Sequence, residues 1–455
     1  MERKKQKTPP TQQLATEPDP PHPPSTRLPP EILHQIFSLY DLLSPLDYVD
    51  SVFDLLAASM VCREWYQAAR PLIPDSHIRC PFTNQSSAKY LVRLRRFSSL
   101  LSTSQELGLP YCAEVNTIWI AVNAFLGSPF ADNDDSDRSP RDLYTAPEDR
   151  NALFKILDLT LPTGLELYVG ITPKNHPPER LAARAHFLSQ LHPYLANVCN
   201  LSLRFPPIKQ PADVHLSNLV RAAQATLTRV TLLGVPDPLT HEALILCTNV
   251  RSAKIFGGDA RATGRILCGW RGLRKVRLTW QQGRISDAIA GLDAACSTLE
   301  DVYIAGRSLV GEAEASEVTS ALESVVSRCE RLKYLEVGKV LMPSLSFSYI
   351  DDAVLRALAR GCRDLEQLTL TAGRGLTGAK MWDDVGKPRW PKLKCLEVEN
   401  EMVVDEFVER VVLECEALEM VVVKVKMDNN SGVRRALEMR GFVGDGKGCW
   451  KRPEA

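Results

Sequence analysis

Apolar residues recur along most of the chain in one short pattern, in which an apolar residue is followed three and five places later by two more. The pattern is clearest where a cysteine stands three places before it, as in CSTLEDVYI, CERLKYLEV, CRDLEQLTL and CEALEMVVV. It also fits WRGLRKVRL and WPKLKCLEV, which have tryptophan in that place. Because apolar and polar residues alternate at its end, each match predicts one short, half-buried strand.

The matches recur at intervals of 23 to 33 residues, which is the spacing of a solenoid built from stacked repeats. Two earlier segments, CAEVNTIWI (112–120) and LFKILDLTL (153–161), fit the pattern more loosely and place the start of the array near residue 111. We therefore predict a solenoid over 111–425, followed by a C-terminal cap or tail over 426–455. The first apolar positions of the nine clear matches are Val198, Leu227, Val250, Leu273, Leu299, Leu332, Leu365, Leu393 and Leu418.

Between the predicted strands the apolar residues take helical spacing. In IDDAVLRALARGC, for example, Val354, Leu355, Leu358 and Cys362 fall on one face of a helix. A unit of one strand and one helix cannot bury its apolar stripe alone, so the repeats must stack on one another. The predicted fold class is α/β, with a curved and irregular array because the repeat lengths vary.

The N-terminal part differs from the array. Residues 1–27 contain seven prolines and few large apolar residues, which predicts a disordered tail. The segment RLPPEILHQIF follows, in which Pro29 and Pro30 favour a helix start and Glu31 adds negative charge to the first turn. A second helix is predicted over 52–69, VFDLLAASMVCREWYQAA, and a helical linker over 75–110. Two short helices give little core, so such a unit tends to need a partner.

These N-terminal residues resemble the F-box family, which has L-P-x-E in its first helix, I-F at its close, and then D-L-L and V-C-R-x-W. The repeats resemble leucine-rich repeats of the cysteine-containing branch. The resemblance implies an F-box at 28–74 that docks on the SKP-type adaptor of a cullin-based ubiquitin ligase. The matching residues are Leu28, Pro29, Ile32, Leu33, Ile36, Phe37, Leu55, Leu56, Val61, Cys62 and Trp65.

Two questions about this module stay open at the level of sequence. Some of the matching residues, especially Ile36, Leu56 and Trp65, could form the core of the module instead of touching the adaptor. The chain between Phe37 and Val61 is also longer than the family pattern, with SPLDYVDSV (44–52) as an insertion that either weakens docking or lengthens a loop.

Side chains alternate along a strand, so the polar positions of the pattern should share the face of the sheet that turns away from the helices. Aromatic residues and arginine are typical anchors of protein interfaces, which makes this face a candidate for binding a protein target. An ordinary solvated strand face is the alternative. The candidates are Arg204, Lys254, Phe256, Arg277, Tyr303, Glu336 and Glu397.

The composition and charge limit the other possibilities. Lys plus Arg and Asp plus Glu number 55 each, so the formal net charge is zero and no overall field draws the chain to nucleic acid or to a membrane. No apolar run approaches the roughly 18 residues of a membrane helix, and the N-terminus lacks a signal-peptide core. We expect a cytoplasmic or nuclear protein.

No motif for catalysis, metal binding or a cofactor stands out. The segment GFVGDGKG resembles a phosphate-binding loop but has Gly448 where Ser or Thr would bind magnesium. The twelve cysteines form no C-x-x-C pair and fall mostly at apolar positions, which predicts buried thiols. We therefore expect no catalytic activity. The resemblance to F-box proteins with leucine-rich repeats implies a substrate-recognition subunit of an SCF-type ubiquitin ligase. The alternative is an F-box scaffold or regulator that binds the adaptor without directing ubiquitylation.

Overall fold

The structure is a computed structural model whose residue contacts divide the chain into two units, Met1–Pro74 and Asp75–Ala455. Leu28 and the proline-rich segment 1–27 lie outside the residues that the structure describes. The described residues are 29–42, 48–73, 87–126, 147–169, 178–205, 212–280, 285–306, 312–339, 350–370, 376, 390–398, 405–423 and 432–453.

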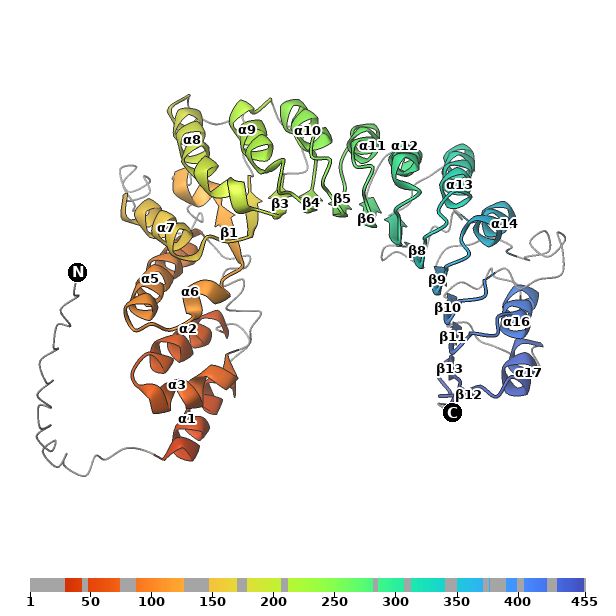
Figure 1. Ribbon diagram of the computed structural model, residues 1–455, viewed down its shortest axis with the longest axis horizontal. Coiled ribbons are helices and arrows are strands. Elements are labelled where there is room, and N and C mark those ends of the chain that lie inside the picture. Colours follow the sequence, from red (N-terminus) through yellow and green to blue (C-terminus); the bar gives the residue numbers. More distant parts are fainter. Residues whose placement is uncertain are drawn as a thin grey trace, which may run out of the picture. The chain divides into compact units, whose positions relative to one another are not determined.

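The first unit consists of short helices, α1 (Pro30–Leu42), α2 (Tyr48–Ser59) and α3 (Arg63–Ala69), followed by the 3-10 turn η1 (Arg70–Leu72) (Figure 1). Helix α1 begins at Pro30, whose missing N–H leaves one fewer backbone donor unsatisfied at the helix start. The carbonyl of Pro29 accepts hydrogen bonds from the backbone N–H groups of Ile32 and Leu33 at 3.0 and 3.1 Å. The two prolines thus fix the start of this helix.

The prediction of one helix over 52–69 is wrong, because the chain turns between α2 and α3. Cys62 stands before α3 with an extended backbone, at φ −162° and ψ 173°. The turn allows α3 to pack against α1, where the rings of Phe37 and Trp65 meet edge to face with centroids 5.3 Å apart. The apolar spacing continues through the turn, so it gave no sign of the break.

The second unit contains a sheet of 13 strands in the order β1 to β11, then β13 and β12. Strands β1 to β11 pair in parallel with their neighbours in sequence, whereas β13 pairs antiparallel with β11 and with β12, so a terminal hairpin ends the described sheet. The strands are β1 (Thr117–Ala121), β2 (Gly164–Tyr168), β3 (Asn200–Arg204), β4 (Arg229–Leu233), β5 (Ser252–Phe256), β6 (Lys275–Trp280), β7 (Asp301–Gly306), β8 (Tyr334–Lys339), β9 (Gln367–Leu370), β10 (Cys395–Val398), β11 (Met420–Val423), β12 (Val443–Gly444) and β13 (Cys449–Lys451).

The helices connect the strands and lie together on the outer side of the sheet (Figure 1). This is the predicted arrangement of one strand and one helix per repeat, and it confirms the α/β solenoid. The α-helices are α5 (Ser87–Glu106), α6 (Tyr111–Glu114), α7 (Pro147–Thr160), α8 (Pro178–Leu191), α9 (Val214–Ala223), α10 (Pro238–Ile245), α11 (Ala260–Gly269), α12 (Ile285–Ala290), α13 (Glu312–Val326), α14 (Asp352–Gly361), α16 (Asp405–Glu414) and α17 (Gly432–Met439). The 3-10 helices are η2 (Val122–Leu126), η5 (His192–Asn197) and η6 (Gly291–Ala295).

The interpretation of 153–161 as a strand is wrong, because this segment belongs to α7. Leu153, Ile156 and Leu157 are buried there at helical spacing, which overlaps the three-place step of the strand pattern. The strand of this repeat is β2, eleven residues after Leu153, where Leu165 and Leu167 are buried and Pro162 takes the first apolar position. Because a proline stands at that position, the strand pattern did not identify this repeat.

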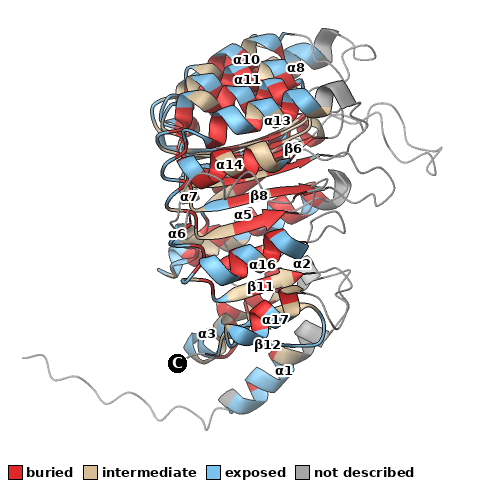
Figure 2. Cartoon of the chain, turned by 90° about the vertical axis from the view of Figure 1, so that its right-hand side faces the viewer, coloured by how far each residue is buried: buried red, intermediate tan, exposed pale blue. Residues whose placement is uncertain are grey.

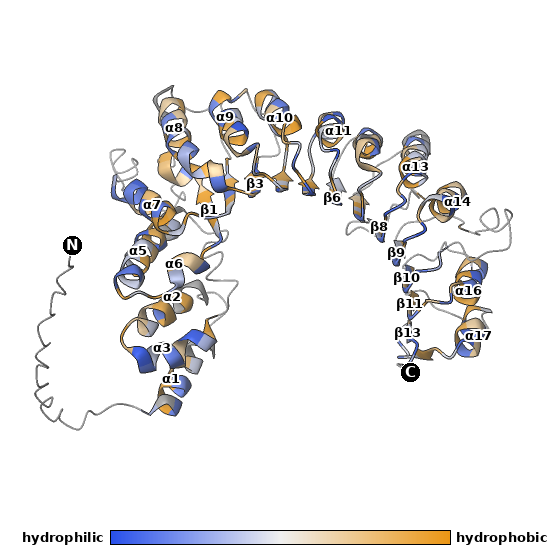
Figure 3. Ribbon diagram, in the orientation of Figure 1, coloured by the Kyte–Doolittle hydropathy of each residue, from blue (hydrophilic) through white to orange (hydrophobic). Residues whose placement is uncertain are grey.

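The core of the second unit lies between the strands and the helix faces that turn toward them, as the buried residues in Figure 2 and the hydropathy in Figure 3 show. The position three residues before the pattern is buried whether it holds Cys329, Cys362 or Trp270. The larger indole also satisfies its polar atom, because Nε1 of Trp270 donates to the Leu244 carbonyl at 2.9 Å. These residues fill the space between one repeat and the next.

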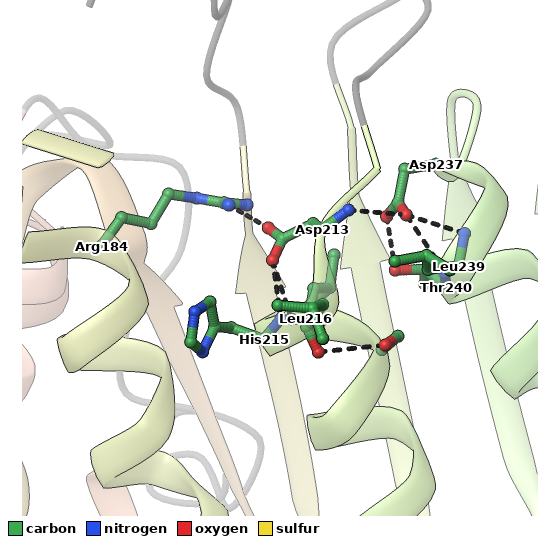
Figure 4. A network of polar contacts seen from close by, with 9 residues as sticks. Arg184, Asp213, His215, Leu216, Asp237, Leu239 and Thr240 are labelled. Carbon is green, nitrogen blue, oxygen red and sulfur yellow. Dashed lines mark hydrogen bonds and ion pairs between the residues drawn. The ribbon is translucent and has the colours of Figure 1, made fainter. Parts of the chain in front are cut away.

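Aspartates cap several helices where the chain leaves the sheet. Asp237, which is 1% exposed, accepts from the backbone N–H groups of Leu239 and Thr240 at the start of α10 (Figure 4). It also accepts from the backbone N–H of Asp213, and Asp213 in turn caps α9 and pairs with Arg184. The caps therefore join consecutive repeats through hydrogen bonds.

Replacing Asp237 with alanine should lower the free energy of unfolding by about 2 kcal/mol, because a buried cap and its bond to the preceding repeat are both lost. Asp259→Ala is the matched control, since Asp259 is exposed and caps α11 through one backbone bond, at Ala262. Asp259→Ala should lower the free energy of unfolding by about 1 kcal/mol or less. Urea unfolding measures both variants, and equal losses would contradict the role given to the link between repeats.

Candidate functional site

The first unit leaves several large apolar side chains in solvent. Ile32 and Ile36, one turn apart on α1, are 40% and 39% exposed, and Val61 at the turn before α3 is 62% exposed. Pro29 and Cys62 are exposed beside them in sequence. A unit this small that leaves so much apolar surface uncovered has the character of a docking module.

The residues matched to the F-box pattern thus fall into two groups. Pro29, Ile32, Ile36, Val61 and Cys62 are exposed, and Trp65 is half-buried against Phe37. The others form the interior of the unit, so the hypothesis that Ile36 belongs to the core does not fit its 39% exposure, whereas Leu56 is 2% exposed. The buried members are Leu33, Phe37, Leu55 and Leu56.

In the second unit, the register of the strands places five of the seven candidate residues in one row across the sheet. Lys254 on β5 pairs with Arg277, which pairs with Tyr303, and this row continues through Glu336 on β8. Two strands later it reaches Glu397. The remaining candidates, Arg204 and Phe256, stand in the next row, joined through Leu233 of β4.

A third row on the same face was not predicted and adds more charge. It contains Arg229 on β4, Lys275 on β6 and Asp301 on β7, each two residues before a member of the first row. The alternation of the strand pattern indicates these positions, since each directly precedes the second apolar residue.

The charges on this face are separated along the array. From β3 to β6 the facing positions hold five cations and no carboxylate, the cations being Arg204, Arg229, Lys254, Lys275 and Arg277. From β7 to β10 they hold three carboxylates and no cation, the carboxylates being Asp301, Glu336 and Glu397. The zero net charge of the chain therefore conceals a basic and an acidic section.

Where the sections meet, charges interact across the strands. The ammonium of Lys275 lies 3.7 Å from a carboxylate oxygen of Asp301, and the guanidinium of Arg277 lies 4.4 Å from the centroid of the Tyr303 ring. Burial and the nearby Glu336 raise the pKa of Tyr303. The positive charge of Arg277 opposes this shift.

Glu336 lies in the acidic section, and its pKa is raised mainly by burial. Glu397 and Asp301 raise it further, while Arg277 lowers it. Repulsion among these carboxylates therefore adds to the effect of burial, and the attraction of Arg277 opposes both. A positively charged group from another molecule would relieve that repulsion.

The described residues offer little that resembles a catalytic centre. They hold no group of three or more metal-ligating side chains. Burial raises the pKa of the Cys247, Cys362 and Cys415 thiols to about 12, which keeps them protonated and poor as nucleophiles. A hydrogen bond with Cys329 lowers the pKa of Cys296, but that side chain is only 6% exposed.

Residues 25–73 match a family model described as F-box-like, and this match covers the whole described helical unit with its exposed Ile32 and Ile36. The helical unit is therefore an F-box-like domain. The second unit is an α/β solenoid of alternating strands and helices.

The other comparisons add less. Among solved structures, the leucine-rich repeat-containing protein LegL7 from Legionella pneumophila matches at 12% identity, over 73% of this chain and 92% of that chain, with a TM-score of 0.35. The repeat architecture follows from the parallel strands and the helices that connect them. No curated protein matches the sequence. Within the described ranges, no helix combines the length and apolar character needed to span a membrane.

Changing Glu336 to glutamine should favour folding increasingly as the pH rises. The pKa of Glu336 is raised in the folded protein, so the folded state holds its proton more tightly and loses stability as pH climbs above the ordinary glutamate value of about 4.3. Glutamine has no such titration. Tm measured at pH 4 and pH 7 should therefore shift in favour of the variant at pH 7, and a shift in favour of the wild type would contradict the raised pKa of Glu336.

Proposed function

We propose that this F-box protein is the substrate-recognition subunit of an SCF-type ubiquitin ligase. Its F-box holds an SKP-type adaptor and, through it, a cullin, while the inner face of the repeats holds a protein target. The observation that carries the proposal is the exposed apolar side chains of Ile32, Ile36 and Val61 within the F-box-like domain.

The adaptor contact is supported by the division of the F-box residues. Leu33, Phe37 and Leu56 already form the interior, so the unit does not need Ile32 and Ile36 for its own core. Burial of an isoleucine side chain against a partner contributes about 1.5–3 kcal/mol. An apolar partner surface would therefore gain most of its binding energy from α1 and the turn at Val61.

The target contact is supported by the charge separation on the repeats. A polypeptide lying across the strands would meet the basic section first at β3–β6 and the acidic section at β7–β10. Such an arrangement favours one direction of binding and disfavours the reverse, because like charges would then face each other. Tyr303 and Phe256 supply aromatic surface at this face.

The mechanism is one of proximity. A target held by the repeats and a ubiquitin-loaded enzyme brought by the adaptor would react at a raised effective concentration. The chain itself would supply no nucleophile, base or metal. Its contribution is the geometry that links two binding surfaces.

Replacing Ile32 and Ile36 together with aspartate should weaken capture of a purified SKP-type adaptor by at least about tenfold, since two apolar anchors would become charges in a desolvated contact. Because both side chains are exposed, the helices should remain folded by circular dichroism. The matched control is His34→Asp, which adds a charge to an exposed polar position of the same helix and should leave capture within about twofold.

If the wild-type chain fails to retain the adaptor, the proposal is wrong.

Delivery of a target needs its own test, in which a protein that binds the repeats accumulates when the chain is depleted from cells. A chain that retains the adaptor while every bound protein keeps its normal level would instead be a scaffold or regulator.

A further inference from the structure

The inner face of the repeats contains a hollow of about 170 Å³ over strands β1 to β5. Its lining includes five short polar side chains, which leave room that long side chains would fill. Among them are the hydroxyls of Ser202, Thr231 and Ser252, and the amide of Asn200. The three hydroxyls make no hydrogen bond to another side chain or to the backbone within the described residues, so each has a donor to offer.

Two cations border this hollow. Arg229 on β4 and Lys254 on β5 are both exposed, and neither forms an ion pair with a carboxylate of the described residues. Arg229 pairs in register with Ser252, two residues before Lys254. Strand spacing and rise therefore place the Cα atoms of the two cations about 8 Å apart, so both side chains can reach one group between them.

The hollow has one carboxylate in its lining, that of Glu166 on β2. It forms an ion pair with Arg204 on the neighbouring strand β3, which neutralises it. The remaining charge at the hollow is therefore positive. Guanidinium and ammonium groups with hydroxyl donors between them are the usual partners of carboxylate and phosphate oxygens.

We propose that this hollow binds an anionic side chain, carboxylate or phosphate, of the target polypeptide. The inference rests on the proposed function of this face in holding a target. Arg229 and Lys254 provide the charge, and the hydroxyls of Ser202, Thr231 and Ser252 donate hydrogen bonds to the oxygens.

A nucleic acid fits this face less well than a polypeptide does. The row that contains Lys254 continues to Glu336 and Glu397, and Asp301 stands beside it. A uniform polyanion extending along the array would meet these carboxylates and be repelled. A polypeptide with a single acidic section could place that section at the basic strands and would not be repelled by these carboxylates.

The test uses the full chain and three short fluorescein-labelled Gly-Ser peptides that differ in a central triplet of serine, phosphoserine or glutamate. Fluorescence anisotropy should show binding of one or both anionic peptides and at least about tenfold weaker binding of the serine peptide. Arg229→Glu and Lys254→Glu should each weaken the anionic peptides by at least about tenfold. Comparison of the phosphoserine and glutamate peptides identifies the source of the anion.

The matched control is Arg265→Glu, which makes the same change in net charge at an exposed position of α11, on the helical layer. It should alter peptide binding by less than about twofold, because a distant exposed charge is screened by salt. Equal binding of all three peptides, or equal losses from Arg265→Glu and Lys254→Glu, would overturn the inference. So would displacement of the anionic peptides by a duplex oligonucleotide that binds more tightly than they do.

Failure here and failure of the proposed function give different results. If no peptide discriminates while the chain still retains its adaptor and a target accumulates on depletion, only the anionic hollow is wrong. If the peptides bind as expected but the adaptor is not retained, the hollow stands and the ubiquitin-ligase role is wrong.

Discussion

The parallel pairing of each strand with the strand of the next repeat is the constraint that shapes the second unit. It fixes the register from β1 to β11, and two apolar rows are thereby buried against the helices. One such strand and helix could not bury that surface, so each repeat is stable only between its neighbours. The same pairing forces the alternate residues into rows on the opposite face, which is why distant residues such as Lys254 and Glu397 belong to one surface.

The helical unit differs from the repeats in how much of its apolar surface it buries. Its short helices bury Leu33, Phe37 and Leu56 and leave Ile32, Ile36 and Val61 in solvent. The repeats bury their apolar rows within the chain, whereas the F-box-like domain leaves these three large apolar side chains exposed. This contrast supports a protein that links two partners, one through apolar contacts and one through a patterned polar face.

Much of the fold could be predicted because burial leaves a regular trace in the sequence. The three- and five-place spacing located β3 to β11, since Leu227, Val230 and Leu232 and their equivalents are all buried. The failures have physical causes. Ile156, Leu159 and Leu161 satisfy the strand spacing although the chain is helical up to Thr160, and Pro162 occupies the apolar position before β2. The break between α2 and α3 comes from packing of Trp65 on Phe37, which local spacing does not record.

The candidate surfaces were predicted less completely than the fold. The polar rows could be listed from alternation, but Glu166 stands on the strand that was missed, so its pairing with Arg204 was not expected. The hollow that brings Ser202, Arg229 and Lys254 together depends on the register of three strands, which no single repeat encodes. Which F-box residues face solvent also depends on how three helices pack.

The most direct test of the account is hydrogen–deuterium exchange of the full chain, alone and with a purified SKP-type adaptor. If the F-box is the docking module, the adaptor should slow exchange of the backbone amides in α1 and in the turn before α3. Exchange across β3 to β11 should stay unchanged, because the proposed adaptor contact does not involve those strands. Slowed exchange in these strands, with none in the F-box, would contradict the division of roles between the two units.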